Sequence, residues 1–242
     1  VVIEEFLTGP EVSVLSFTDG KTVVPMVSSM DHKRALDHDE GLNTGGMGTV
    51  APNPYYTSDI AKECMEKIFL PTIEGMKKEG RTFKGCLYFG LMLTADGPKV
   101  IEYNCRFGDP EAQVVLPLLE SDLLEVMQAV TEERLAEQEV KFSSGAACCV
   151  VMASDGYPKK YDKGYEITIE DSVKDYVYVA GAKIVDGKLL TDGGRVLGVI
   201  AKGDDIAKAI DAAYKNVDFV HFDNQYYRSD IGQKALKALK EV

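Results

Sequence analysis

The chain has 242 residues, with 39 acidic and 27 basic side chains and a formal net charge of −12. This acidic balance argues against a dedicated nucleic-acid-binding protein, which normally presents a basic face. The hydrophobic content of 45 % is ordinary for a globular protein and excludes wholesale disorder. The five cysteines form no CxxC pair, and no apolar run is long enough for a transmembrane helix, which argues against a zinc ribbon, a disulfide scaffold and a membrane span.

The first part of the sequence predicts strands followed by one long loop. An apolar run over residues 1–6 and an alternating run over 12–17 are typical of strands. Asp19-Gly20 is a strong hairpin signal, and residues 21–27 are expected to return as the partner strand. Residues 28–54 lack periodicity and hold four glycines, so we expect a long functional loop there.

The next part predicts helices and strands in alternation. Ser58 or Asp59 is expected to cap a helix that runs to about Lys78, and Pro71 should kink it or end its first segment. The other elements expected here are strands over 85–94 and 99–103, a helix that begins at Asp109-Pro110, and a helix over 121–136.

After Val140 the pattern is that of a small α+β domain. Strands are expected over 146–153, 176–185, 188–191 and 195–201, and helices over 204–217 and 230–239. We therefore expect a first domain over residues 1–140 and a second over 141–242.

A candidate metal site lies at the end of the strand expected over 99–103. Glu102 and Asn104 are two residues apart, so on a strand their side chains point to the same face. A carboxylate and an amide oxygen are hard ligands that suit Mg²⁺, with water and phosphate completing its shell. The pair alone is also compatible with an ordinary polar strand end.

The residues after this pair supply groups that suit phosphate. Arg106 is a cation, Gly108 allows a turn, and Asp109-Pro110 begins a predicted helix. Guanidinium groups and helix N-termini both bind phosphate oxygens. Metal, phosphate and a cation together are the apparatus of phosphoryl transfer.

Two other segments are candidate binding sites, although neither is specific when taken alone. Glu4 to Leu7, followed by Glu11, could present main-chain groups to a flat heterocycle and a carboxylate to ribose hydroxyls, although these residues alone favour an exposed edge strand with solvated glutamates. Asp31-His32-Lys33-Arg34 precedes the run from Asn43 to Gly48, whose glycines allow backbone to approach an anion closely. His32 and His38 lack metal-ligand spacing.

Taken in order, these pieces resemble the ATP-grasp ligases, and among them the phosphoribosylamine–glycine ligase family, also called glycinamide ribonucleotide synthetases. Three strings carry the resemblance: Asp31 to Arg34, Asn43 to Gly48, and Val100 to Glu111. The segments around Gly193-Gly194-Arg195 and Asp230-Ile231-Gly232 are similar to the family's C-terminal domain. The resemblance implies an α+β chain: the C-terminal half of an ATP-grasp domain, an antiparallel sheet with helices, followed by a small α+β domain.

The resemblance also implies a reaction. ATP phosphorylates the carboxylate of glycine, and the amine of 5-phosphoribosylamine attacks the glycyl phosphate. The products are glycinamide ribonucleotide, ADP and phosphate, a step of purine biosynthesis in the cytoplasm. No protein nucleophile is needed, so catalysis would rest on positioning and charge neutralisation.

Site residues follow from the same resemblance. The main chain at Glu4 and Leu7 should meet adenine, Glu11 should hold the ribose, and Glu102 and Asn104 should bind Mg²⁺ or Mn²⁺. Arg106, Lys33 and Arg34 should act on substrate phosphate, carboxylate or the transferring phosphoryl group, with the division among them left open. The residues expected to bind substrate are Asp31, Asn43, Thr44, Gly45, Gly46, Met47, Gly48, Asp109 and Pro110.

The chain opens at Val1 without Met, where the family's adenine-binding strand begins. We therefore expect a C-terminal portion of the enzyme that is inactive by itself and whose partner is the missing N-terminal region. Two alternatives stay open: another ATP-grasp carboxylate–amine ligase, and a non-catalytic fragment that retains nucleotide or metal binding.

Overall fold

The computed structural model describes residue 1 and residues 3–241. The chain forms two compact units. The first contains residues 1–29, 53–108 and 119–143, and the second contains residues 30–52, 109–118 and 144–242. No helix among the described residues has the length and apolar character required to cross a membrane.

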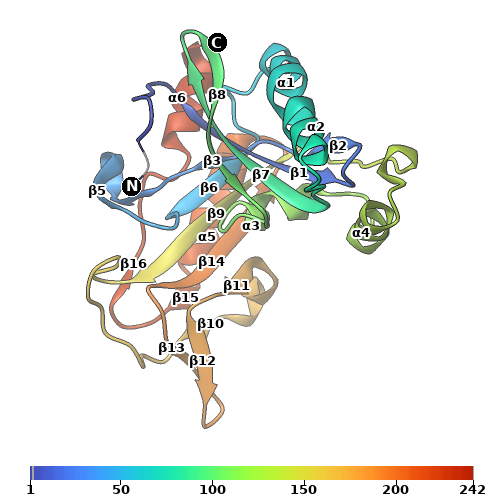
Figure 1. Ribbon diagram of the computed structural model, residues 1–242. Coiled ribbons are helices and arrows are strands. Elements are labelled where there is room, and N and C mark those ends of the chain that lie inside the picture. The colour runs from blue at the N-terminus through green and yellow to red at the C-terminus, as the bar shows by residue number, and fades with distance from the viewer. Residues whose placement is uncertain (2, 242) are drawn as a thin grey trace. The chain divides into compact units, whose positions relative to one another are not determined.

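The first unit is built on a four-stranded antiparallel sheet with the order β2-β1-β7-β8 (Figure 1). Its strands are β1 (Glu11–Thr18), β2 (Val23–Pro25), β7 (Gly85–Thr94) and β8 (Gly97–Asn104). The predicted Asp-Gly hairpin is confirmed, since Asp19 Oδ1 accepts bonds from the Lys21 and Thr22 N–H groups at 2.9 and 2.7 Å.

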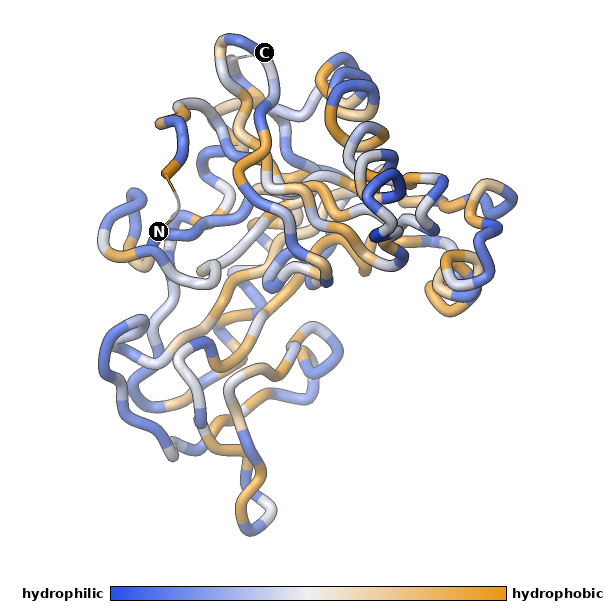
Figure 2. Tube along the Cα trace, in the orientation of Figure 1, coloured by the Kyte–Doolittle hydropathy of each residue, from blue (hydrophilic) through white to orange (hydrophobic). Residues whose placement is uncertain are grey.

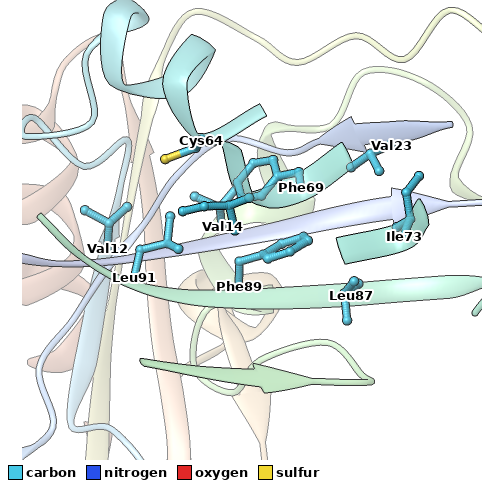
Figure 3. Close-up of a cluster of buried hydrophobic side chains, with 10 residues drawn as sticks. Val12, Val14, Val23, Cys64, Phe69, Ile73, Leu87, Phe89 and Leu91 are labelled. Atoms are coloured by element: carbon cyan, nitrogen blue, oxygen red, sulfur yellow. The ribbon is translucent and has the colours of Figure 1, made fainter. Parts of the chain in front are cut away.

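One face of this sheet packs against a long helical segment made of α1 (Ser58–Cys64), the π-helical turn η2 (Met65–Phe69) and α2 (Leu70–Lys78). Alternate strand residues face these helices and form the core shown in Figure 3. Phe69 and Phe89 lie with ring centroids 4.1 Å apart at its centre. The helix predicted over 58–78 is confirmed, and Pro71 lies in the first turn of α2, just after η2.

A shorter helical region completes the first unit. Helix α4 (Leu123–Thr131) begins after Asp122, whose Oδ1 accepts from the Leu124 and Glu125 N–H groups. The 3₁₀ turn η4 (Leu135–Glu137) follows, and its Leu135 N–H donates to Asp19 Oδ2 at 3.1 Å. The helix expected over 121–136 is therefore shorter than predicted.

The second unit is built on a six-stranded sheet in which β11, β14, β9, β6 and β3 follow one another and β16 pairs with the end of β9. The strands are β3 (Met30–Asp31), β6 (Gly48–Ala51), β9 (Ala146–Ser154), β11 (Val177–Val179), β14 (Arg195–Gly203) and β16 (Gln225–Tyr226). The tube of Figure 2 shows the hydrophobic colour of the central strands β9 and β14, as burial of both sheet faces requires.

Different segments cover the two faces of this sheet. Helices α5 (Ile206–Val217) and α6 (Gln233–Glu241) belong to one side, where Ile210 of α5 and Val50 of β6 both lie close to Gly232. The other side carries α3 (Ala112–Val115) and the 3₁₀ turn η3 (Leu116–Leu118), and Gln113 there lies close to Gly198. Segment 109–118 therefore packs on the sheet from the side opposite α5.

Smaller elements lie around this sheet. They are β4 (Arg34–Leu36), η1 (Asp37–Asp39), β5 (Glu40–Asn43), β10 (Thr168–Ile169), η5 (Asp171–Tyr176), β12 (Ala182–Val185), β13 (Lys188–Thr191) and β15 (Val220–His221). The β12–β13 pair closes over Asp186-Gly187, as the sequence predicts, and projects as a hairpin at the bottom of Figure 1.

Three predictions of local structure are wrong. The described residues before Glu11 form no strand, because their backbone makes no ladder with a neighbour. Residues 28–54 are no structureless loop, since β3 and β6 join the six-stranded sheet and β4 pairs with β5. Asp109-Pro110 does not begin a helix, because α3 starts at Ala112.

The compact units also cut across chain order. Because β6 forms hydrogen bonds with β9, residues 30–52 pack with the C-terminal residues. Compactness does not decide where a family domain begins, and the division at residues 140 and 141 stays a prediction.

Candidate functional site

The first candidate site lies on the face of the four-stranded sheet opposite the helices. Met92 of β7 pairs with Glu11 of β1 on one side and with Lys99 of β8 on the other. Residues paired across antiparallel strands point to the same face, so these three side chains form a row. The neighbouring row contains Ser13, Gly90 and Glu102. The predicted ribose and metal residues thus share one face of the sheet.

A β-bulge is responsible for this arrangement. In β8, Val100 pairs with Leu91 but Glu102 pairs with Gly90, so Ile101 is an extra residue. Lys99 and Glu102 are three residues apart and would point to opposite faces of a regular strand. The inserted residue shifts the alternation by one and brings both side chains to the same face.

Glu102 and Asn104 follow the bulge in a regular ladder, opposite Gly90 and Tyr88. Gly90 leaves room for the carboxylate, because a Cβ on that glycine would lie 2.8 Å from Glu102 Cγ. Tyr103 points the other way, where its ring meets Phe89 with centroids 5.6 Å apart. The oxygen ligands therefore fit a Mg²⁺ ion by donor chemistry. The described residues contain no group of three or more His, Cys, Asp or Glu side chains that could hold a metal, so other ligands would complete the shell.

The predicted adenine segment borders a cavity of about 320 Å³ in the same unit. Its lining consists of Glu4, Glu5, Phe6, Leu7, Met92, Lys99, Val100 and Ile101. Lys99 Nζ donates to Glu5 Oε1 and Oε2 at 3.0 and 2.9 Å across it. Glu4 and Leu7, which are predicted to meet adenine, thus line this cavity. Met92 lines it too and is paired with Glu11 in the neighbouring strand.

The turn that follows this segment is fixed by close packing. The Leu93 N–H donates to the Pro10 carbonyl at 2.9 Å. Gly9 has φ +147°, and a Cβ there would lie 2.0 Å from the Leu93 carbonyl oxygen. Only glycine fits this close approach of two backbones.

Arg106 also belongs to the first unit. Its side chain is exposed, and Nη1 donates to the Phe107 carbonyl at 2.8 Å. The guanidinium has further N–H groups available by valence for an anion. Phe107 packs edge-on against Phe17, with centroids 6.3 Å apart, and this contact holds the turn that carries Arg106.

The second candidate site surrounds the glycine-rich run in the second unit. Arg195 is the clamp that organises it: Nη1 donates to the carbonyls of Gly45, Gly46 and Asp109 at 2.8, 3.3 and 2.9 Å. The same nitrogen lies 3.1 Å from Asp109 Oδ1. Arg195 thereby joins the 45–48 loop to the segment that begins at Asp109.

The loop itself is closed by short hydrogen bonds. The Thr44 N–H and hydroxyl both donate to the Lys33 carbonyl, at 2.7 and 2.9 Å, and the Gly46 N–H donates to Thr44 Oγ1 at 3.0 Å. Gly46 has φ +113°, and a Cβ there would lie 2.5 Å from Pro110 Cδ and 2.6 Å from Asp31 Oδ1. Gly46 is therefore enclosed between two residues that were predicted to bind substrate.

Three other residues predicted to belong to the site make contacts that stabilise the fold. The Met47 side chain is fully buried, and its N–H and carbonyl bond to the His32 carbonyl and the Val151 N–H. Arg34 Nη1 donates to the Gly41 carbonyl at 2.7 Å within the β4–β5 pair, where Arg34 is paired with Asn43. Gly48 starts β6 and pairs with Val150.

The second site contains two carboxyl groups, of Asp31 and Glu111, that are shielded from solvent. Glu111 is 4 % exposed, and Asp31 Oδ1 is buried with no hydrogen-bond partner among the residues that the structure describes. Burial and the nearby Glu111 raise the pKa of Asp31 well above its usual range, against the opposing effect of Lys33. Burial also raises the pKa of the Cys149 thiol, so this cysteine is an inert core residue.

Sequence reasoning gave several of these residues no site role. Arg195 stood out only as the residue after two glycines, and Glu111 only as the end of a motif. Their importance arises from burial beside partners distant in sequence, which no local pattern reports.

Comparison with known proteins identifies the class of this fold. A family model described as the ATP-grasp (A) domain of phosphoribosylglycinamide synthetase matches residues 1–112. A second model, the C domain of the same synthetase, matches residues 147–234. The chain is therefore of the ATP-grasp class. The row of Glu11, Met92 and Lys99 lies within the residues that the ATP-grasp model matches.

Sequence and structure comparisons with individual proteins agree with the family models. The phosphoribosylamine–glycine ligase of Caldanaerobacter subterraneus subsp. tengcongensis is 47 % identical over 96 % of this chain and 56 % of its own length. The trifunctional purine biosynthetic protein adenosine-3 of Gallus gallus is 50 % identical over 100 % of this chain and 24 % of its own. The crystal structure of phosphoribosylamine–glycine ligase from Thermotoga maritima matches with TM-score 0.87 and 36 % identity, over 94 % of this chain and 57 % of that one.

The chain belongs to the phosphoribosylglycinamide synthetase family. The predicted fold class is thereby confirmed, and the bacterial relatives are ligases by name. The chain spans about half the length of the bacterial relatives it matches.

Proposed function

We propose that the chain is part of an enzyme that ligates glycine to 5-phosphoribosylamine at the expense of ATP. The products would be glycinamide ribonucleotide, ADP and phosphate, in the purine pathway of the cytoplasm. The observation that carries the proposal is the shared sheet face on which Glu11, Glu102 and Asn104 lie beside the cavity at Glu4 and Leu7. The ligase names of the relatives supply the substrates.

In this proposal the first unit binds the nucleotide. The main chain at Glu4 and Leu7 takes the adenine edge, and the Glu11 carboxylate accepts from the ribose hydroxyls. Glu102 and Asn104 hold Mg²⁺ or Mn²⁺ by their oxygens. When bound, the cation neutralises phosphate charge during phosphoryl transfer. Arg106 offers donors to the carboxylate that becomes the acyl phosphate.

The second unit supplies substrate contacts in this proposal. The Arg195 clamp supports the backbone at Gly45 and Gly46, and Lys33 and Arg34 add positive charge for an anionic substrate. Asn43, Thr44, Asp109 and Pro110 frame the same loop. Catalysis then rests on orientation and charge neutralisation without a covalent protein intermediate. In the domain division that we propose, these residues belong to the first domain over 1–140, except Arg195, which belongs to the second over 141–242.

The test is ADP release by the longer enzyme that contains this chain, measured with a coupled assay. Glycine and phosphoribosylamine together should be required for turnover. ADP release that ignores glycine would overturn the proposal. Replacing glycine with other small carboxylates tests the alternative of a different ATP-grasp ligase, which would accept another acid in preference.

The 242-residue chain itself is expected to turn over negligibly and to bind ATP at most weakly, in a Mg²⁺-dependent way. The remaining length of the relatives would supply the rest of the site. Calorimetry with ATP and Mg²⁺ on the purified chain measures this directly. Robust ligation by the chain alone would contradict the assignment of a missing N-terminal partner region.

A further inference from the structure

A row of polar atoms without partners lies under α3, on the face of the six-stranded sheet opposite α5. Asp31 pairs with Thr49, and Thr49 pairs with Cys149, so these three side chains point to one face. Gln113 of α3 lies against the same face, because its Cγ and Cys149 Sγ both approach Gly198. We call Asp31, Thr49 and Gln113 the acceptor row.

Each member of the acceptor row has a buried oxygen with no hydrogen-bond partner in the described structure: Asp31 Oδ1, Thr49 Oγ1 and Gln113 Oε1. The Thr49 side chain is 0 % exposed, so its hydroxyl has no contact with bulk solvent in this conformation. A buried polar group without a partner destabilises a protein by about 1–3 kcal/mol. Such groups clustered on one face therefore indicate a bound species that supplies the missing donors.

The charged residues around the acceptor row indicate which kind of ligand could supply the missing donors. Glu111, 4 % exposed, adds a second buried carboxylate to that of Asp31. Lys33 and Arg195 lie near enough to influence Asp31, yet neither donates to its Oδ1. A ligand that fits must carry N–H donors and tolerate carboxylates, which describes a primary ammonium group.

The glycine-rich loop lies directly above the carboxylate end of this row. Gly46 packs over Asp31 Oδ1, where a Cβ would lie at 2.6 Å, and Pro110 lies on the other side of that glycine. The absence of a side chain at Gly46 keeps the carboxylate oxygen from being covered by carbon. The same loop is the one that the Arg195 clamp holds.

We propose that Asp31 Oδ1 and Thr49 Oγ1 bind the primary ammonium group of the amino-acid substrate, with Asp31 as its counter-ion. This assignment rests on the proposed function for the identity of that substrate as glycine. The ammonium-binding chemistry itself follows from the buried oxygens and the carboxylates, and it is testable without turnover. Gln113 marks the far end of the acceptor row.

The experiment measures thermal unfolding of the 242-residue chain with methylammonium chloride as the probe, against potassium chloride at equal ionic strength. The wild-type chain should melt at a higher temperature with methylammonium than with potassium. Asp31→Asn should lose this difference, and Thr49→Val should retain at most half of it. Equal methylammonium responses in Thr49→Val and wild type would overturn the proposal.

Stability without the probe gives a second, independent readout. Valine has the shape of threonine without the hydroxyl, so Thr49→Val should leave the melting temperature unchanged or higher. Thr191→Val is the matched control, because Thr191 is equally buried but its Oγ1 accepts from the Gly164 and Tyr165 N–H groups at 3.1 Å. This control should melt at a lower temperature and keep the methylammonium response. A drop for Thr49→Val like that of Thr191→Val would indicate a permanent hydrogen-bond network and overturn the proposal.

The longer enzyme separates this inference from the proposed function. Thr49→Val should raise the KM for glycine roughly 10-fold or more and leave the KM for ATP unchanged. If glycine proves not to be a substrate while the methylammonium response follows Asp31 and Thr49, the function fails and the ammonium site stands. If glycine is turned over with an unchanged KM in Thr49→Val, the site fails and the function stands.

Discussion

His32 Nε2 accepts a hydrogen bond from the Gly232 N–H at 3.1 Å, across 200 residues of sequence. On the other side of the ring, Nδ1 donates to the Gly48 carbonyl at 3.1 Å. Only the neutral imidazole with its proton on Nδ1 satisfies both partners. The ring is 1 % exposed, and it joins the start of β6 to the turn before α6. This histidine, which lacks metal-ligand spacing, is a structural link within the second unit.

The chain should therefore lose stability in mild acid. Burial and the nearby Arg228 lower the pKa of His32 from 6.5 to about 4. Above pH 6.5 the ring is neutral in both states, whereas between pH 6.5 and 4 the unfolded state binds the proton and the folded state does not. This linkage should reduce the free energy of unfolding by about 3 kcal/mol across that window. Urea unfolding at a series of pH values measures it.

A pair of variants isolates the contribution of this imidazole. In His32→Asn, the side-chain amide can still donate to the Gly48 carbonyl but does not titrate, so the slope of stability against pH should flatten between 6.5 and 4. His221→Asn, at an exposed position in β15, should keep the slope of the parent. An unchanged slope in His32→Asn would show that another group causes the acid sensitivity.

Removing the buried guanidinium of Arg228 should destabilise the second unit strongly. Arg228 is 0 % exposed, and its Nε and Nη2 donate to the two Asp230 oxygens at 2.8 Å, while Nη1 donates to Asp39 and to the Arg34 carbonyl. Arg228→Ala leaves the Asp230 carboxylate without its cation and removes one of the two cations at Asp39, where Lys234 remains, at a cost of about 3–5 kcal/mol. Chemical denaturation compares it with Lys215→Ala, which breaks an exposed pair with Asp211 and should change stability by less than about 1 kcal/mol. Equal losses in the two variants would contradict this ranking.

Adding a methyl group at Gly46 should disrupt the glycine-rich loop. The residue has φ +113°, and the new Cβ would collide with Pro110 Cδ and Asp31 Oδ1. Gly46→Ala should therefore lower the melting temperature of the chain and abolish glycine-dependent turnover in the longer enzyme. Gly75→Ala in α2 is the control, since nothing lies within 4 Å of its Cβ position and alanine should stabilise the helix by about 0.5–1 kcal/mol. A Gly46→Ala chain as stable as the parent would refute the clash.

Loss of the amide oxygen at Asn104 should weaken metal-dependent activity in the longer enzyme by orders of magnitude. Asn104→Ala removes one of the two oxygen ligands that we propose for the cation. Tyr103→Phe is the matched control, because Tyr103 lies on the opposite face, where its hydroxyl contacts the exposed Thr72 hydroxyl at 3.1 Å. Titrating Mg²⁺ and Mn²⁺ against both variants measures the effect. Parental activity in Asn104→Ala would remove the metal assignment.

The sequence by itself determined the features that depend on neighbouring residues. Asp19-Gly20 specified a hairpin, alternation put Glu102 and Asn104 on one face, and a helix was expected over 204–217, where the structure has α5. These features follow from backbone preferences and the two-residue period of a strand, which act over a few residues. The family strings, from Asp31 to Arg34 and from Val100 to Glu111, then identified the class of enzyme.

Only the tertiary structure decided the features that depend on distant partners. Residues 28–54 lack a strand signal because β3 and β6 are short, and they become strands by pairing within a sheet anchored on β9. The bulge at Ile101, which turns Lys99 to the same face as Glu102, appears only in the register with β7. The Arg195 clamp and the acceptor row likewise arise from burial among segments that are distant in the sequence, since Arg195 bonds to Gly45 across 150 residues and Thr49 pairs with Cys149. A local pattern carries no information about such partners.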